Sequence, residues 1–442
     1  MPKLYSHVAL SQFSSALFEA AGLDRERAEV MASVFLEADL LGFTTHGMNR
    51  VAINLTWLQQ AKSRIDGEPE VLADGGNLFN WDANFLPGPW VVSKAIEQCI
   101  ERVASRGIVC ATIRRSQHIA CLGAYCPPIA EAGYVALITC STPNEKTVSA
   151  YGGIEPVFSA NPLAFVAPSD DYPVLFDISM CITAGGYVRR ALREGNKLPG
   201  KFLKDANGEI TDDPAAFYTD PPGSILPIGG LSHGYKGYAL TLMTEILSMA
   251  LGGYGRANDT AATDGEANSV FIQMIDPQAF GSLDDFKRQI NKIKSMCENS
   301  TTRPGDDPVR VALLRHGRSG QHDRGIISPG PSRIRDASVS AVPLGAGVDR
   351  QAVREVEARG TSARVAIPEL DVPLLALAPR SGAGAEYYPA ARLVIELNDS
   401  LSDHVRMMVG QRNDTGAKHD TVCALGSSSQ KEFGRRDDLP TG

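Results

Sequence analysis

Two residues with complementary chemistry, His46 and Arg50, directly follow an apolar N-terminal segment. They are four positions apart, so a continuing helix would project both side chains from one face. A reaction that reduces a carbonyl beside a carboxylate needs a proton donor for the oxygen and a cation for the carboxylate. Histidine suits the first role because its pKa lies near neutral pH. The arginine fork suits the second because it matches a carboxylate. The plain structural alternative is a helix-end histidine and a surface arginine.

A second histidine, His118, follows an expected buried strand over 108–113 by a few residues. Loops after strand ends are where α/β proteins place their ligands. His118 is therefore a further candidate for the site, with a structural loop histidine as the alternative.

Two stretches of small residues stand where a helix is expected to begin. One runs from Asp177 to Gly186, and the other from Ile228 to Gly237. Free backbone N–H groups at a helix start favour a phosphate or carboxylate, and glycine allows a close approach. Neither stretch has the Rossmann GxGxxG fingerprint or the P-loop pattern. Simple glycine-rich turns remain the alternative reading.

Apolar spacing predicts the elements that must position these residues. Two helices are expected in the first 60 residues, one capped by Ser11 and ending at Gly22, the other capped by Asp24 and running to Leu41. Further along, strands and helices alternate, which predicts an α/β sheet core with a helical N-terminal part. The expected strands are 108–113, 134–139, 174–178 and 271–275, and the expected helices 91–103, 184–193, 238–251 and 283–296.

The composition excludes several classes of protein. The 442 residues carry 43 Lys+Arg and 51 Asp+Glu, a net charge of −8, which argues against a nucleic-acid partner. No apolar run is long enough to span a membrane, and the N-terminus has no signal-peptide pattern. Eight cysteines without zinc spacing predict reduced thiols and a cytoplasmic location.

The composition also changes along the chain. Only Tyr387, Tyr388 and Phe433 are aromatic after residue 290, and residues 301–442 carry 2 Lys against 17 Arg. Periodicity is poor over the same stretch. We therefore expect an atypical, low-order tail over 312–442, explained either by disorder or by a shifted reading frame after about residue 311.

Several ordered motifs together resemble one family, over roughly residues 5–305. This is the malate/L-lactate dehydrogenase family of NAD(P)-dependent oxidoreductases, which is unrelated to the Rossmann-type lactate and malate dehydrogenases. Thr45-His46-Gly47-Met48-Asn49-Arg50 corresponds to the family's Ser-His-Gly-x-x-Arg. The other matching segments are Gln117-His118-Ile119, Pro156 to Phe165, Val174 to Ser179, Leu226 to Gly230, Tyr235 to Tyr238 and Ile275 to Phe280.

The resemblance implies a three-layer α/β fold of the L-sulfolactate-dehydrogenase-like type, a homodimer, and hydride transfer between NAD or NADP and C2 of a small 2-oxo or 2-hydroxy acid. It implies that His46 moves the proton and Arg50 anchors the carboxylate. His118 would lie beside the substrate as a second catalytic histidine, and the Thr45 hydroxyl, in place of the usual serine, could bond His46. The implied cofactor contacts are Asp177, Ile178, Ser179, Tyr235 and Lys236.

The chain departs from the family pattern at several positions. Asn54 stands where many relatives have a substrate-side tyrosine, Tyr187 where a polar or charged residue is common, and the expected Pro-Gly-Glu does not follow Val311. A cyclic imine-2-carboxylate reductase and a family member that binds ligand without turnover are therefore the alternative functions. The expected division is a helical part (1–75), a dinucleotide-binding α/β domain (76–255), a return segment (256–311) and the tail.

Overall fold

The computed structural model describes residues 7–258, 266–306 and 308–311. Among these residues, no helix is both long and apolar enough to cross a membrane. The expected low-order tail, residues 312–442, lies outside the described residues, and so do both explanations offered for it.

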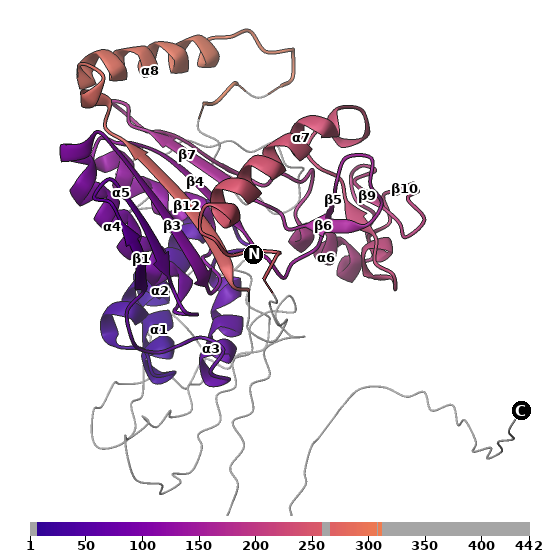
Figure 1. The fold of residues 1–442 in the computed structure, drawn as a ribbon. Helices are drawn as coiled ribbons and strands as arrows, with labels where there is room; N and C mark the ends of the chain where they lie inside the picture. The colour runs from indigo at the N-terminus through magenta and orange to yellow at the C-terminus, as the bar shows by residue number, and fades with distance from the viewer. Residues whose placement is uncertain (1–6, 259–265, 307, 312–442) are drawn as a thin grey trace, which may run out of the picture.

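A seven-stranded sheet forms the centre of the described part of the chain (Figure 1). Strand β12 is antiparallel to both β3 and β4, and β7 is antiparallel to both β4 and β8. Strands β3, β4 and β8 are therefore parallel, and their carboxyl ends lie at one edge of the sheet. In spatial order the strands are β1 (Glu70–Asp74), β2 (Leu78–Asp82), β3 (Ile108–Ser116), β12 (Asn268–Ile275), β4 (Val135–Ser141), β7 (Leu163–Ala167) and β8 (Val174–Ile178).

Helices cover both faces of this sheet. On one face lie α4 (Gly88–Arg106) and α5 (Cys126–Glu131), and on the other lie α7 (Gly230–Glu245) and its π-helical continuation η4 (Ile246–Ala250) (Figure 1). Successive side chains of a strand point to opposite faces. In β4, Ile138 is fully buried, whereas the Thr139 hydroxyl lies 2.7 Å from the Ser248 hydroxyl of η4. The predicted three-layer α/β fold is confirmed.

A second, smaller sheet lies beside the first and packs against α6 (Gly185–Glu194) and η3 (Pro214–Tyr218). Its own apolar core contains Val148, Val188, Leu203 and Ile225. The sequence patterns did not predict this sheet, because strands of two or three residues are too short to show a period. In spatial order its strands are β10 (Ile210–Thr211), β9 (Leu203–Lys204), β11 (Ser224–Ile225), β5 (Val148–Ser149) and β6 (Pro156–Phe158).

The N-terminal helices are α1 (His7–Ala20), α2 (Arg25–Leu40) and α3 (Val51–Gln59), with the short turn η1 (Met48–Arg50) before α3. Asp24 caps α2 as predicted, since its carboxylate accepts the Arg27 N–H at 2.8 Å. The predicted Ser11 cap is wrong because α1 already begins at His7. The helix before His46 also does not continue, since α2 ends at Leu40 and Gly42 has a φ of +86°.

The remaining predicted elements are present with shifted ends. Strands β3, β4, β8 and β12 cover the four expected strands, and α4 and α6 cover their expected helices. The helix expected from Tyr238 begins eight residues earlier, because Gly229 adopts a φ of +94° that starts α7 at Gly230. The other elements of the described residues are η2 (Leu122–Tyr125), η5 (Pro277–Ala279) and α8 (Leu283–Glu298), with α8 at the opposite end of the sheet from α1 and α3 (Figure 1).

Candidate active site

Three residues that are far apart in the sequence meet at the edge of the sheet where β3 and β4 end. His46 and Arg50 come from the turn between α2 and α3, and His118 follows β3 by two residues. The rings of His46 and His118 are stacked, with centroids 5.7 Å apart and planes at 19°. Arg50 Nε donates to His118 Nε2 at 2.9 Å. The structure therefore brings together two imidazoles and a guanidinium, although His46 and Arg50 do not share a helix.

The environment of His118 keeps its ring neutral. The side chain is buried, and the Phe35 ring of α2 stacks on it with centroids 6.3 Å apart. Burial, then the Arg50 charge and then His46, lower the pKa of His118 well below its usual value. A neutral imidazole is therefore the form present at neutral pH.

Two N–H donors approach the two ring nitrogens of His118. The Ala120 backbone N–H points at Nδ1 over 3.1 Å, and Arg50 Nε points at Nε2 over 2.9 Å. A neutral imidazole accepts at one nitrogen only, because the other carries the proton. The two contacts therefore compete for one acceptor nitrogen. If Arg50 moved away, the Ala120 N–H would remain bonded to Nδ1, so Nδ1 would be the acceptor and Nε2 would carry the proton and act as the donor.

Thr45 links His46 to the first turn of α6. Its Oγ1 lies 2.9 Å from His46 Nδ1. A Cβ on Gly186 would lie 2.9 Å from the Thr45 methyl group, so glycine permits this close approach. Among the residues that the structure describes, no side chain caps α6, and a Cβ on Gly185 would meet nothing within 4 Å. The open start of α6 therefore lies beside the catalytic candidates, and a helix N-terminus favours an anionic group.

Arg50 is held by further contacts on both its backbone and its side chain. Asn54 donates to the Arg50 carbonyl at 2.8 Å. Arg50 Nη2 donates to Glu266 Oε1 at 2.9 Å. Sequence reasoning did not identify Glu266, because it is 216 residues away from Arg50 and matches no motif.

Sequence reasoning also missed the buried carboxyl group of Asp39, which contacts the turn between α2 and α3. Asp39 accepts the Met48 backbone N–H at 2.8 Å, and burial raises the pKa of Asp39 to about 7. Its position among apolar residues of α2 is the one signal that the sequence offered. Asp39 therefore supports the turn that presents His46 and Arg50.

Of the expected cofactor contacts, Asp177, Ile178 and Ser179 lie where β8 ends, at the same edge as His118. The buried Asp177 carboxylate accepts the Gly123 N–H at 2.8 Å, which ties β8 to the segment after His118. Ile178 is half-buried, and Ser179 Oγ is 3.4 Å from the Cys181 carbonyl.

Tyr235 and Lys236 lie on an exposed side of α7. The Tyr235 ring meets Tyr151 edge to face with centroids 6.0 Å apart, and Lys236 Nζ lies 5.9 Å from the centre of the Tyr235 ring. The contacts of these two residues are thus with each other and with neighbouring rings, rather than with His46, Arg50 or His118.

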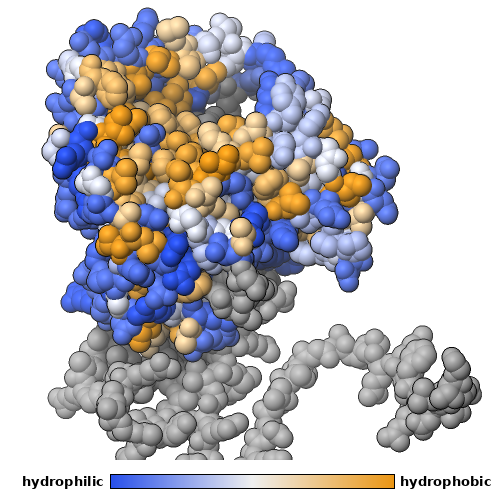
Figure 2. All heavy atoms as spheres, viewed as in Figure 1, coloured by the Kyte–Doolittle hydropathy of each residue, from blue (hydrophilic) through white to orange (hydrophobic). Residues whose placement is uncertain are grey.

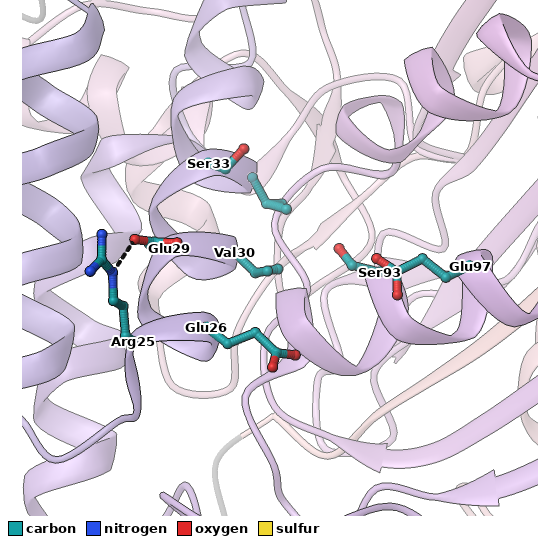
Figure 3. Close-up of a pocket in the computed structure, with 8 residues that line it drawn as sticks. Arg25, Glu26, Glu29, Val30, Ser33, Ser93 and Glu97 are labelled. Atoms are coloured by element: carbon teal, nitrogen blue, oxygen red, sulfur yellow. Dashed lines mark hydrogen bonds and ion pairs between the residues drawn. The ribbon is translucent and has the colours of Figure 1, made fainter.

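A surface groove between α2 and α4 is separate from this site (Figure 3). Glu26, Glu29 and Glu97 line it, and Arg25 Nε is paired with Glu29 at 2.7 Å. The groove is open, and neither His46, Arg50 nor His118 lines it. We assign it no chemistry.

Comparisons with known proteins show the family to which the chain belongs. Residues 5–321 match the family described as malate/L-lactate dehydrogenase. The chain is 30% identical over 299 residues to L-sulfolactate dehydrogenase of Methanothermobacter thermautotrophicus, covering 66% of this chain and 84% of that protein. It is 28% identical over 345 residues to hydroxycarboxylate dehydrogenase B of Escherichia coli O157:H7, covering 76% and 89%.

Solved structures share the fold. Malate dehydrogenase from Entamoeba histolytica superposes with a TM-score of 0.67 at 23% identity, covering 71% of this chain and 89% of that one. Δ1-Piperideine-2-carboxylate reductase from Pseudomonas syringae superposes with a TM-score of 0.60 at 27% identity, covering 67% and 90%.

Proposed function

Because the chain belongs to the malate/L-lactate dehydrogenase family of oxidoreductases, we propose that it transfers hydride between a nicotinamide dinucleotide and C2 of a small 2-oxo or 2-hydroxy acid. The observation that carries this proposal is the meeting of His46, His118 and Arg50 at one sheet edge. A proton carrier, a neutral hydrogen-bond donor and a carboxylate anchor are the groups that such a reaction needs.

Arg50 anchors the substrate carboxylate in this proposal. Its guanidinium fork matches two carboxylate oxygens, which fixes the orientation of the acid. Turning toward the substrate takes Nε away from His118. His118 Nε2 then carries the ring proton and donates to the substrate oxygen, while the Ala120 N–H holds Nδ1.

His46 moves the proton on the substrate oxygen. The Thr45 hydroxyl, 2.9 Å from Nδ1, fixes the orientation of the ring. His118 is suited to polarise the oxygen rather than to deliver a proton, because its lowered pKa keeps it neutral. The two stacked rings therefore have different roles.

The cofactor is NAD or NADP, and the site residues fit a dinucleotide. The uncapped start of α6, with open space at Gly185, suits a diphosphate beside Thr45. We propose that Asp177, Ile178 and Ser179 line the nicotinamide side and that Tyr235 and Lys236 contact the dinucleotide from α7. When bound, the cofactor supplies or accepts the hydride.

We also propose that the protein is a cytoplasmic homodimer without nucleic-acid or membrane partners. Leu231 and Leu242 of α7 and Ile246 at the start of η4 recur at helical spacing and are all exposed. Figure 2 shows further hydrophobic side chains across the middle of the same view. Such a stripe favours burial against a second copy. Light scattering after chromatography tests this, and Ile246→Glu should shift the mass to that of a monomer.

We propose the division into a helical part (1–75), a dinucleotide-binding domain (76–255) and a return segment (256–311). The position of the His46 turn before the sheet and of β12 after α7 supports it.

The test is oxidation of NADH and NADPH with pyruvate, oxaloacetate and a cyclic imine-2-carboxylate, and oxidation of ureidoglycolate with NAD and NADP. His46→Ala should abolish turnover of the best substrate, whereas His7→Ala, at the remote start of α1, should not. Equal rates in wild type and His46→Ala would overturn the role of His46.

A cyclic imine-2-carboxylate reductase is a second candidate, favoured by the similarity to the piperideine-carboxylate reductase. It needs the same anchor and hydride, so preferred turnover of the imine identifies it. A protein that only binds ligand is the third. Binding of a dinucleotide can be followed by quenching of the fluorescence of the buried Trp57, Trp81 and Trp90. Such quenching together with turnover of an acid would exclude a protein that only binds ligand.

A further inference from the structure

The positive charge of Arg50 is already shared with a carboxylate of this chain. Arg50 Nη2 and Glu266 Oε1 are 2.9 Å apart, and the two side chains are 27% and 24% exposed. A substrate carboxylate that binds Arg50 therefore arrives next to Glu266. Partial burial makes the interaction between these charges stronger than it would be at the surface.

The backbone of Glu266 is fixed beside the catalytic candidates. Its N–H donates to Gln117 Oε1 at 3.2 Å, and Gln117 is fully buried and directly precedes His118. The Gln117 amide in turn donates to the Lys62 carbonyl. Glu266 is thus part of the framework that holds His118.

A second acidic residue, Glu145, comes to the same place from the end of β4. Ser141, the last residue of β4, pairs with Ser269 near the start of β12. The segment after Ser141 and the segment before Ser269 therefore extend from the same edge of the sheet. Arg256 Nη1 holds the Glu145 carbonyl at 3.1 Å. Although residue 145 is exposed as a whole, burial of its carboxyl group and the nearby Glu266 raise its pKa to about 7.

The positive charge of the anchor is therefore offset within the protein, and Glu145 adds a negative charge nearby when it ionises, while Arg256 and Arg189 also act on Glu145. Arg50 supplies one positive charge, Glu266 removes it, and His118 stays neutral. One substrate carboxylate gains a guanidinium partner, whereas a second carboxylate or a sulfonate on the same molecule meets a carboxylate of the protein.

We propose that Glu266, assisted by Glu145, makes the site selective for acids that carry a single carboxylate and no second negative charge. The substrate is then a monoanionic 2-oxo or 2-hydroxy acid whose remaining part is neutral or cationic. This inference rests on the proposed function, since it assumes that Arg50 anchors the substrate.

Binding measurements test the selectivity without turnover. Calorimetry compares oxamate, which has one carboxylate, with oxalate, which has two, both with and without bound dinucleotide. Wild type should bind oxamate more tightly. Glu266→Gln should improve the affinity for oxalate relative to that for oxamate by about tenfold. Removing a unit charge from a partly buried site changes the binding constant of a nearby charged group by about that factor. Glu145→Gln should shift the ratio in the same direction by less.

Turnover provides the second readout, as the ratio of kcat/KM for oxaloacetate and pyruvate. Glu97→Gln, which removes a charge from the remote groove, is the matched control and should leave both ratios unchanged. Equal affinity of wild type for oxamate and oxalate overturns the selectivity. The selectivity is also overturned if Glu266→Gln raises the affinity for both ligands equally. Glu266 then only competes with the substrate carboxylate for Arg50. Absence of turnover with an intact oxamate preference would contradict the proposed function alone.

Discussion

The carboxyl group of Asp39 lies where the side chain of residue 47 would be. A Cβ built on Gly47 would be 2.3 Å from both Cγ and Oδ1 of Asp39. The same carboxyl group accepts the Met48 N–H at 2.8 Å. The glycine between His46 and Met48 therefore permits this close approach and does not serve a positive φ, and Asp39 contacts the turn at two adjacent residues.

Gly47→Ala should impair catalysis more than folding. The added methyl group must displace either the Asp39 carboxyl group or the turn that carries His46 and Arg50, and a misplacement of about 1 Å costs about 100-fold in rate. We expect kcat/KM to fall by about that factor with a small decrease in Tm. Gly281→Ala is the matched control, since its Cβ would meet nothing within 4 Å. Wild-type kcat/KM in Gly47→Ala would show that the turn tolerates the shift.

Asp39 should make stability depend on pH. Burial raises its pKa from 3.8 to about 7, so the folded state binds more protons than the unfolded state between these values. The contribution of Asp39 to stability is therefore complete below about pH 4 and decreases as the pH rises toward 7. Asp39→Asn lacks this titration. Between pH 5 and pH 8, wild type should lose up to about 2 kcal/mol relative to Asp39→Asn in urea unfolding. Parallel pH profiles of the two proteins would mean that Asp39 has an ordinary pKa.

The sequence predicted the sheet core because its strands are long and apolar enough to show a pattern. The spacing of His46 and Arg50 and the position of His118 after an expected strand also marked these residues as candidates, since both are local features. The sequence could not show which side chain each of these residues contacts. Glu266 meets Arg50 only because β12 returns between β3 and β4, and no local pattern encodes that pairing.

The wrong local predictions have a common physical cause. Ser11 is a good cap, but apolar residues on both sides of it pack into the core, so α1 extends through it. The glycines from 229 to 237 look like a turn. Instead, Gly237 lets α7 lie against the preceding loop, because a Cβ there would be 2.5 Å from Ile228 N. In both cases packing overrides the local preference.

The hydrogen bond between Asp177 and Gly123 predicts a stability difference between two variants. Asp177→Ala removes the acceptor of a buried N–H, which costs about 1–3 kcal/mol. Asp177→Asn keeps a side-chain oxygen of the same shape and should lose much less. Urea unfolding measures both. Asp66→Ala, at an exposed residue with only a 3.9 Å contact to Arg64, should be neutral. Equal losses in the Asn and Ala variants would indicate that the negative charge, rather than the acceptor, is what the fold needs.

Arg50 should act on His118 through its charge as well as its hydrogen bond. In wild type, ¹³C-labelled histidine spectra should show no titration of His118 near its usual pKa of 6.5, because burial, Arg50 and His46 all lower it. Arg50→Ala removes the second of these causes, so the pKa should rise, yet stay below the usual value since burial remains. Arg64→Ala, at an exposed residue, is the control and should leave the His118 titration unchanged. A His118 that titrates normally in wild type would contradict the neutral ring, and with it the separate roles of the two histidines.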